Sequence, residues 1–288
     1  IIATSLILFF VGVKDDIVGT APVKKLFAHI VVALILVLIG DIRITGLHGI
    51  FGVSDIPYWG SVFLSIFTYV VVVNSFNLID GVDGLAAGVG FLSCCAFGVW
   101  FIFASEFPYA ALSFALAGAL LGFLIFNFSP AKIFMGDSGS LIIGMFVCVM
   151  AIKLIEYPIQ QLDSFWVNIS KPVFAISALA YPLMDTLRVF IIRALKGQSP
   201  FNADRNHIHH KLLDCKFSHT KTVVIIYVFS MLIVCASVLT YFFNSPSNNN
   251  GPTYSLLAVV SIAALFLFYV INLNSKKNKV KRSHDSSH

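Results

Sequence analysis

Long apolar runs separated by short polar segments dominate the pattern of this chain. Eight of the runs can cross a bilayer as helices, since roughly 17–25 apolar residues span its hydrocarbon core. We predict these spans over 24–40, 57–75, 85–104, 107–127, 139–155, 173–192, 222–243 and 253–273. A ninth run, IIATSLILFFVGV (1–13), is too short to cross alone, and we expect it to end a helix that begins upstream.

The apolar runs are continuous rather than alternating, and this pattern favours helices over barrel strands. Lipid offers the backbone no hydrogen-bond partners, so spans must be helices or closed barrels. The sequence therefore predicts an all-α fold, a polytopic integral membrane helical bundle with about nine transmembrane helices present and N-terminal helices missing. We expect a single transmembrane catalytic domain over 1–273 and a basic cytoplasmic tail over 274–288 without fixed structure.

Basic residues are distributed unequally between the two sides of the membrane. With alternating spans, sixteen of the nineteen Lys and Arg residues fall on one side, which the positive-inside rule makes the cytoplasm. The cytoplasmic loops would be 14–23, 74–84, 128–138 and 193–221. The composition also indicates a membrane protein, with 58% hydrophobic residues, 11% charged residues and a mean hydropathy of +0.90. The net charge of +5 indicates a lipid bilayer as partner and no nucleic acid.

Acidic and amide side chains gather at the cytoplasmic ends of these spans. Ionisable residues are costly at such positions, so they are functional candidates by default. Asp15 and Asp16 end the first run, and NSFNLIDGVDG places Asn77, Asp80 and Asp83 at spacing i, i+3 and i+6. On a helix the last three would share one third of the circumference.

A later segment, NFSPAKIFMGDSGSLIIG (127–144), breaks one span and starts the next. Lys132 adds a positive charge, and Asp137 lies at the predicted helix start. Exposed N–H groups at that start suit an anionic ligand. Further along, Asp185 and Arg188 at i and i+3 predict an ion pair.

The longest cytoplasmic loop carries a cluster of histidines in DRNHIHH, which begins at residue 204. Arg205, His207, His209 and His210 are its candidate donors to phosphate. If 203–215 is helical, His207 and His210 share one stripe while His209 points away from His207. The alternative interpretation is a solvated basic loop.

Oxygen ligands facing basic donors favour a site for a hard cation and phosphates. We expect Mg²⁺, with Mn²⁺ as the alternative, because Mg²⁺ commonly takes one or two protein oxygens and completes its shell with water and phosphate. This predicts metal-dependent phosphoryl transfer at a membrane surface. Two other functions stay open: a secondary transporter that uses the acids to carry ions, and a membrane phosphatase acting on lipid diphosphates.

Four motifs, in order and spacing, carry a resemblance to a known family. VGVKDD, NLIDGVDGLAAG, AKIFMGDSGSL and GQSPFNADRNHIHHKLL resemble the polyprenyl-phosphate N-acetylhexosamine-1-phosphate transferases, relatives of the translocase that starts lipid-linked peptidoglycan synthesis. The resemblance implies a helical bundle in the bacterial plasma membrane with a cytoplasmic active site. It also implies transfer of a sugar-1-phosphate from a UDP-sugar to undecaprenyl phosphate, with Mg²⁺ required and UMP released.

The resemblance also implies a role for each candidate residue. The metal-binding positions are Asn77 and Asp137. Acids near the lipid phosphate and the nucleotide form the catalytic set, Asp15, Asp16, Asp80 and Asp83. The substrate-binding set is Lys132, Arg205, His207, His209 and His210. Whether an aspartate acts as general base or as covalent nucleophile stays open.

The interrupted histidine motif, HIHH, bears on the substrate. The muramoyl-pentapeptide branch of the family tends to have three adjacent histidines, whereas Ile208 separates them here. The spacing resembles the branch that uses UDP-N-acetylglucosamine. We therefore expect GlcNAc-1-phosphate transfer, starting a lipid-linked cell-envelope glycan, and retain a homodimer as a candidate assembly.

Overall fold

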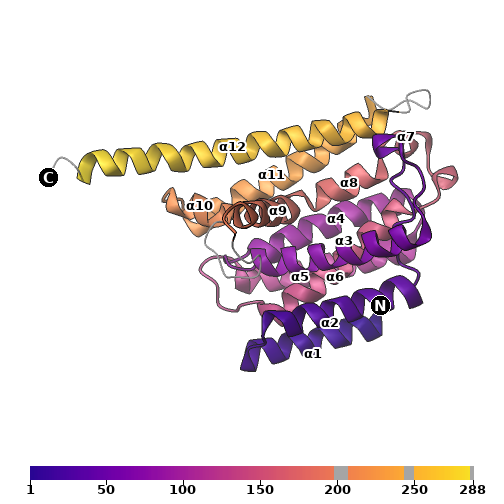
Figure 1. Cartoon of the computed structure of the whole chain (residues 1–288), viewed down its shortest axis with the longest axis horizontal. Coiled ribbons are helices and arrows are strands. Elements are labelled where there is room, and N and C mark those ends of the chain that lie inside the picture. The colour runs from indigo at the N-terminus through magenta and orange to yellow at the C-terminus, as the bar shows by residue number, and fades with distance from the viewer. Residues whose placement is uncertain (198–206, 243–249, 286–288) are drawn as a thin grey trace.

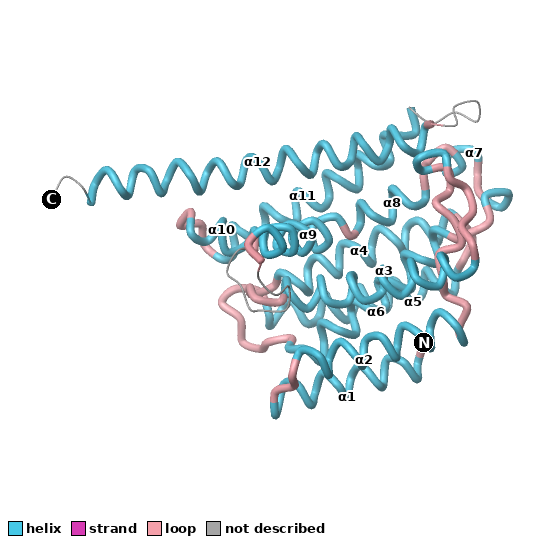
Figure 2. Tube along the Cα trace, in the orientation of Figure 1, coloured by secondary structure: helices cyan, strands magenta, loops and turns pink. Residues whose placement is uncertain are grey.

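Helices build almost all of the regular structure of this protein, as Figures 1 and 2 show. The computed structural model describes residues 1–197, 207–242 and 250–285, apart from the side chains of Ser164 and of 274–285. Within these residues the β-pairing is one isolated bridge between Gly46 and Asp55. The predicted all-α fold is therefore confirmed.

Seven helices in the described part of the chain are long and apolar enough to cross a membrane. They are α2 with its continuation (Pro22–Ile39), α3 (Tyr58–Ile79), α4 (Leu85–Phe103), α5 (Phe107–Asn127), α6 (Gly136–Ile155), α11 with its continuation (His219–Phe242) and the first part of α12 (Gly251–Asp285). Helices α8 (Lys171–Ala178) and α9 (Ala180–Leu195) form an eighth candidate, bent by 76°. The chain is thus a multi-pass membrane protein.

Several shorter helices complete the described structure. Helix α1 (Ile2–Val18) has 17 residues and packs against α6. Helix α10 (Ile208–Asp214) carries part of the histidine motif, and α7 (Ser164–Val167) belongs to the other end of the bundle. Figure 1 shows α10 and α7 at opposite ends.

Three helix boundaries differ from those predicted. Helix α3 continues to Ile79, so Asn77 is helical, but Asp80 is the non-helical C-cap residue and Asp83 follows in a turn. The predicted helical stripe through these three residues is therefore wrong. The bend between α8 and α9 interrupts the span predicted over 173–192. Helix α12 continues to Asp285, where no fixed structure was expected, because extending an existing helix costs far less than nucleating one.

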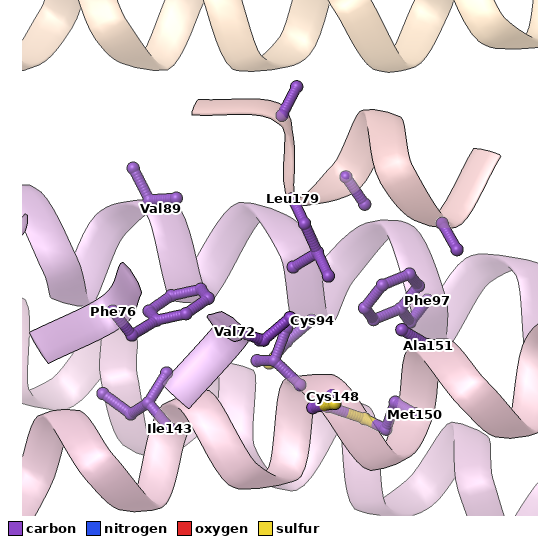
Figure 3. Close-up of a cluster of buried hydrophobic side chains, with 14 of the residues drawn as sticks. Val72, Phe76, Val89, Cys94, Phe97, Ile143, Cys148, Met150, Ala151 and Leu179 are labelled. Atoms are coloured by element: carbon purple, nitrogen blue, oxygen red, sulfur yellow. The ribbon is translucent and has the colours of Figure 1, made fainter. Parts of the chain in front are cut away.

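The apolar core lies between α3, α4, α6 and α8. Figure 3 shows Phe76 of α3, Phe97 of α4 and Ile143 of α6 within this cluster, and all three are at least 96% buried. Of the most apolar stretch of each membrane-crossing helix, 67% is buried in α4 and 72% in α6, against 11% in α12. Helices α4 and α6 are therefore central, while α12 presents most of its surface to lipid.

Glycines allow α6 to approach its neighbours at backbone distance. A Cβ atom on Gly144 would lie 2.8 Å from the Cα of Val73 on α3. One on Gly12 of α1 would overlap the backbone of Ser138 near the start of α6. Small residues at such crossings let membrane helices pack closely, and here they bring the end of α1 onto the start of α6.

Polar contacts define two ends of the bundle. At the end that we call the site end, the last turns of α1 and α3 meet the first turns of α2 and α6. At the opposite end, Glu156 accepts a hydrogen bond from the backbone N–H of Thr45 at 2.9 Å, and His48 Nε2 lies 3.1 Å from its Oε1. Burial raises the pKa of Glu156, but hydrogen bonds from His48 and Thr45 outweigh burial and lower it.

Substituting Gly12 should separate α1 from α6. We expect Gly12→Ala to lower the free energy of unfolding by about 1–3 kcal/mol, because a methyl group there overpacks the crossing. Thermal unfolding in detergent measures this. The control is Gly118→Ala on α5, where a Cβ meets nothing within 4 Å and helix propensity favours alanine. Equal midpoints for the two variants would contradict the close α1–α6 packing.

Candidate active site

Three oxygen-bearing side chains from different helices converge on the ammonium group of Lys25 at the site end. Lys25 lies in the first turn of α2, with Nζ 3.5 Å from Asp15 Oδ2 on α1 and 3.3 Å from Asn77 Oδ1 on α3. It also forms a close ion pair with Asp137 Oδ2 in the first turn of α6. Three predicted site residues thus share one positive charge.

Lys25 itself was not among the predicted site residues. It follows Pro22 at the start of a span in PVKKLF, and ionisable side chains at such boundaries are functional candidates. That rule selected the acids and could equally have selected this lysine. Only the contacts separate it from its neighbour Lys24.

The amide of Asn77 has a fixed orientation. Its Nδ2 donates to Asp137 Oδ1 at 2.6 Å and to Ser140 Oγ at 3.0 Å, and Ser140 is fully buried. Both amide hydrogens are thereby used, so Oδ1 is the atom that faces Lys25. Ser140 is a supporting residue that the sequence analysis missed.

The donor set around Lys25 fits a hard divalent cation. Carboxylate and amide oxygens are the ligands that Mg²⁺ prefers, and here they already surround a single positive charge. In the described residues, no group of three or more His, Cys, Asp and Glu side chains could hold a metal ion. A cation bound here would therefore draw on Asn77 and Asp137 and complete its shell with water or phosphate oxygens, as Mg²⁺ commonly does.

Asp16 follows Asp15 of the Lys25 cluster in the sequence, and its side chain lies against the start of α6. Its Oδ1 accepts from the backbone N–H of Asp137 at 2.8 Å, and its Oδ2 from that of Ser138 at 3.1 Å. Gly136 has φ of +65°, and a Cβ there would lie 2.8 Å from both carboxylate oxygens. These N–H groups were predicted to be available to an anionic ligand. That prediction is wrong for the two that Asp16 holds, because the α1–α6 crossing brings its carboxylate there.

Asp80 and Asp83 lie in the turn between α3 and α4. The pKa of Asp80 is raised to about 7. Burial and then the negative charge of Asp16 raise it, and they outweigh a hydrogen bond from the Gly136 backbone that lowers it. Asp83 Oδ2 accepts from the backbone N–H of Ala131 at 3.2 Å. The turn is thus tied both to the start of α6 and to the loop that precedes it.

Asn127, at the end of α5, connects the loop over 128–135 to this turn. Asn127 Oδ1 accepts from Gly84 N at 3.0 Å, and Nδ2 donates to the Ile133 carbonyl at 2.9 Å. This buried amide was missed by the sequence analysis. Lys132 is exposed in the loop. A cavity of about 70 Å³ lies beneath it, lined by Asp80, Gly81, Val82, Asp83, Asn127, Phe134 and Met135.

The histidine motif packs against α9 rather than facing solvent. His207 Nδ1 lies 2.9 Å from Asp185 Oδ2. The rings of His207 and His209 stack with centroids 5.3 Å apart and planes 8° apart, and His210 lies 4.4 Å from His209. The prediction that His209 points away from His207 is therefore wrong. Helix α10 begins only at Ile208, so His207 precedes the helix and does not follow its periodicity.

His209 connects the histidine motif to the Asp80–Asp83 turn. Its side chain is 1% exposed, and its Nε2 has no hydrogen-bond partner among the described residues. That atom lies 3.5 Å from the position of a Cβ built on Gly81. Burial lowers the pKa of His209 to about 3 despite the charge of Asp185, so the imidazole is neutral near pH 7. Arg205 lies outside the described residues.

An apolar pocket of about 410 Å³ opens beside the Lys25 cluster. Its polar lining includes Asp15, Lys25 and Asn77, and Arg193 of α9 also lines it. Its apolar wall is formed by Pro22, Leu26, Phe67, Val70, Val71, Leu78 and Phe190. A second apolar cavity, of about 220 Å³, is also lined by Phe67 and Val71. The candidate site therefore combines a charged cluster with apolar space between membrane helices.

The fold and the site define a class of protein, a polytopic helical membrane protein with a cluster of acidic, amide and lysine side chains at one end of an apolar pocket. Comparison with known proteins gives its family. The model of glycosyl transferase family 4 matches residues 1–155, and the chain belongs to this family. The resemblance to this family is thus confirmed, and the protein is a transferase.

Curated relatives match most of the chain. The decaprenyl-phosphate N-acetylglucosaminephosphotransferase of Mycobacterium leprae is 31% identical over 270 residues, which cover 88% of this chain and 67% of the relative. The enzyme of the same name from Mycobacterium tuberculosis strain H37Rv is 31% identical, covering 92% and 69%. The undecaprenyl-phosphate alpha-N-acetylglucosaminyl 1-phosphate transferase of Escherichia coli K12 is 28% identical, covering 91% and 69%.

Burial of a neutral His209 predicts a loss of stability in acid. The pKa of His209 is about 3 in the folded protein and 6.5 in the unfolded chain. Between these pH values the unfolded chain binds more protons, so the free energy of unfolding falls as pH falls, by at most about 1.4 kcal/mol per pH unit. The thermal midpoint of the wild type should therefore be lower at about pH 5 than at about pH 7. This difference should be smaller in His209→Gln, which lacks the titrating imidazole.

The matched control for this prediction is His219→Gln, at an exposed position. It should keep the pH dependence of the wild-type midpoint. A pH dependence of the same size in His209→Gln would contradict the burial of a neutral imidazole at this position.

Proposed function

We propose that the protein transfers a sugar-1-phosphate, GlcNAc-1-phosphate, from a UDP-sugar to undecaprenyl phosphate and releases UMP. One observation carries the proposal: Asp15, Asn77 and Asp137 converge on one cation position, and Asp15 and Asn77 also line an apolar pocket. The relatives named above support the choice of a polyprenyl phosphate and N-acetylglucosamine. The unequal distribution of basic residues supports a cytoplasmic site.

The phosphate and the first isoprene units of the acceptor lipid fit the 410 Å³ pocket. Its apolar wall suits an isoprenoid chain, and Lys25 and Arg193 in the lining suit its phosphate. Because the pocket reaches the Lys25 cluster, a phosphate bound there would lie beside Asp15 and Asn77. This arrangement would keep the hydrocarbon between helices while the reacting group stays at the site end.

The nucleotide-sugar donor fits the other half of the site, around the Asp80–Asp83 turn. The loop over 128–135 and the turn both line the 70 Å³ cavity. His209 of the histidine motif faces Gly81 of the turn. Phe134 in that loop is 78% exposed and offers a ring on which a nucleobase can stack. Lys132 adds a point charge for a phosphate. Asp80 and Asp83 would lie near the reacting diphosphate.

Asn77 and Asp137 are the residues that would hold Mg²⁺, with Mn²⁺ as the alternative. The ion would supply positive charge between two anionic substrates, which otherwise repel each other. Asp15 and Lys25 complete the charged surroundings of this position. Asp16 organises the start of α6 through its two hydrogen bonds, so its role in the proposal is to place Asp137.

The chemistry asks little of a protein base. A phosphate monoester has a second pKa near 6, so the acceptor is mostly a dianion at neutral pH. One of its oxygens would form a bond to the β-phosphorus of the UDP-sugar, and the bond from that phosphorus to the bridging oxygen would break. UMP would leave with that oxygen. We favour this direct attack over a covalent aspartyl intermediate, because the acceptor already carries charge.

The test is a transfer assay with purified protein, undecaprenyl phosphate, radiolabelled UDP-N-acetylglucosamine and Mg²⁺. We expect label in the lipid and UMP in solution. Asp137→Asn should lower the rate by about 100-fold or more, because it removes a charge that organises the cation position. Asp41→Asn is the control, since that side chain is 78% exposed at the opposite end.

The outcome also separates the alternatives. Release of inorganic phosphate from added undecaprenyl diphosphate would indicate a lipid diphosphate phosphatase. Uptake of an ion without any transfer of label would indicate a transporter. Either result without UMP release would contradict the proposed function.

Filling the apolar pocket should weaken acceptor binding selectively. We expect Val71→Trp to raise the KM for undecaprenyl phosphate about tenfold, because the indole occupies space that the lipid needs, while the KM for the UDP-sugar stays the same. Steady-state kinetics with each substrate varied in turn measures this. Phe63→Trp on the same helix is the control, since Phe63 is 74% exposed. An equal change in both KM values would contradict a lipid site in this pocket.

A further inference from the structure

Asp185 is a fully buried carboxylate in the second turn of α9. Its Oδ2 lies 2.9 Å from His207 Nδ1, and its Oδ1 accepts the backbone N–H of Ile208 at 2.8 Å. Arg188, the predicted ion-pair partner, is farther away, with Nη1 4.0 Å from Oδ1. A carboxylate without solvent needs such partners to remain charged. Among the residues that the structure describes, both of its contacts shorter than 3 Å are with the histidine segment.

These two contacts fix different parts of that segment. The bond to Ile208 anchors the backbone where α10 begins. The contact with His207 places a proton on Nδ1, because the carboxylate can only accept. A carboxylate on one ring nitrogen sets the tautomer and the orientation of the other nitrogen, as in the outer shells of metal sites. Asp185 therefore determines which nitrogen of His207 can meet a ligand.

The orientation of His207 extends to His209 through their stacked rings. On the α9 side, His209 Nδ1 lies 3.4 Å from the Tyr181 hydroxyl and 3.8 Å from Asp185 Oδ2. Its other nitrogen faces Gly81 and has no hydrogen-bond partner among the described residues. A buried polar atom without a partner is costly unless a ligand satisfies it.

We propose that Asp185 is a positioning residue, which holds the His207–His209 pair so that His209 Nε2 faces the Asp80–Asp83 turn and can hydrogen-bond a phosphate oxygen of the donor. This inference rests on the proposed function, because that function places the donor diphosphate at this turn. Asp185 acts through the histidines and does not touch the substrate itself. Gly81 lacks a side chain that would close the space between His209 and the turn.

Asp185→Asn is the sharpest variant, because it keeps the size of the side chain and an oxygen for the N–H of Ile208. The amide nitrogen would then face the Nδ1 proton of His207, donor against donor. We expect kcat/KM for UDP-N-acetylglucosamine to fall by about 10–100-fold, with the KM for undecaprenyl phosphate unchanged. Asp214→Asn is the matched control, since it removes an exposed carboxylate from α10, the short helix that carries His209.

A double-mutant cycle shows whether Asp185 acts through His207. If it does, Asp185→Asn combined with His207→Gln should be no slower than His207→Gln alone. Losses that multiply in the double variant would overturn the inference. Gly81→Ala offers a second approach should Asp185→Asn fail to fold, because it places a methyl group 3.5 Å from His209 Nε2. It should raise the KM for the UDP-sugar only, and an unchanged KM would count against a ligand in that space.

A spectroscopic measurement separates this inference from the proposed function. In protein labelled with ¹⁵N-histidine, NMR should detect an exchange-protected Nδ1 proton of His207 in the wild type and in Asp214→Asn, but not in Asp185→Asn. Persistence of that proton in Asp185→Asn would overturn the inference whatever the activity. A wild-type protein that shows the proton but transfers no label would overturn the proposed function and leave the positioning of the histidines standing.

Discussion

A single ammonium group joins the ends of four helices in this protein. Lys25 on α2 contacts Asp15 on α1, Asn77 on α3 and Asp137 on α6. Two carboxylates this close would repel each other strongly in surroundings of low dielectric unless a cation lay between them. The interaction that assembles this end of the bundle is therefore also the one that creates a cation position. Substrate anions and any divalent ion would meet an arrangement of oxygens that helix packing has already fixed.

Backbone packing around α6 determines how that charge cluster relates to the rest of the site. The crossing at Gly12 brings Asp16 onto the first N–H groups of α6 and so orients Asp137. The same helix start donates to Asp80 through Gly136. The Lys25 cluster, where we propose the acceptor, and the turn after α3, where we propose the donor, are thus connected through one helix terminus. A small displacement of α1 would therefore change the geometry both at the Lys25 cluster and at the turn after α3.

The proposed donor site depends on burial rather than on exposed charge. Histidines in a basic loop suggest cationic contacts to phosphate, yet His209 is buried and neutral. Asp185 and Tyr181 of α9 set the direction of the imidazoles, so specificity would come from oriented hydrogen bonds rather than from net charge. The bend before α9 matters here, because it gives that helix a direction different from α8 and lets it face the histidine segment.

The sequence by itself determined the all-α membrane fold, most of the spans and the family, and it selected Asp15, Asn77 and Asp137 as candidate site residues. These follow from local hydrophobicity and from motifs whose residues are close together along the chain. Only the tertiary structure decided that Lys25 lies between these oxygens, that Asp16 binds the start of α6, and that Asp185 holds His207. Such contacts join residues from 10 to about 120 positions apart. They depend on how closely two helices approach, as at Gly12, and hydrophobic periodicity within one helix carries no information about that distance.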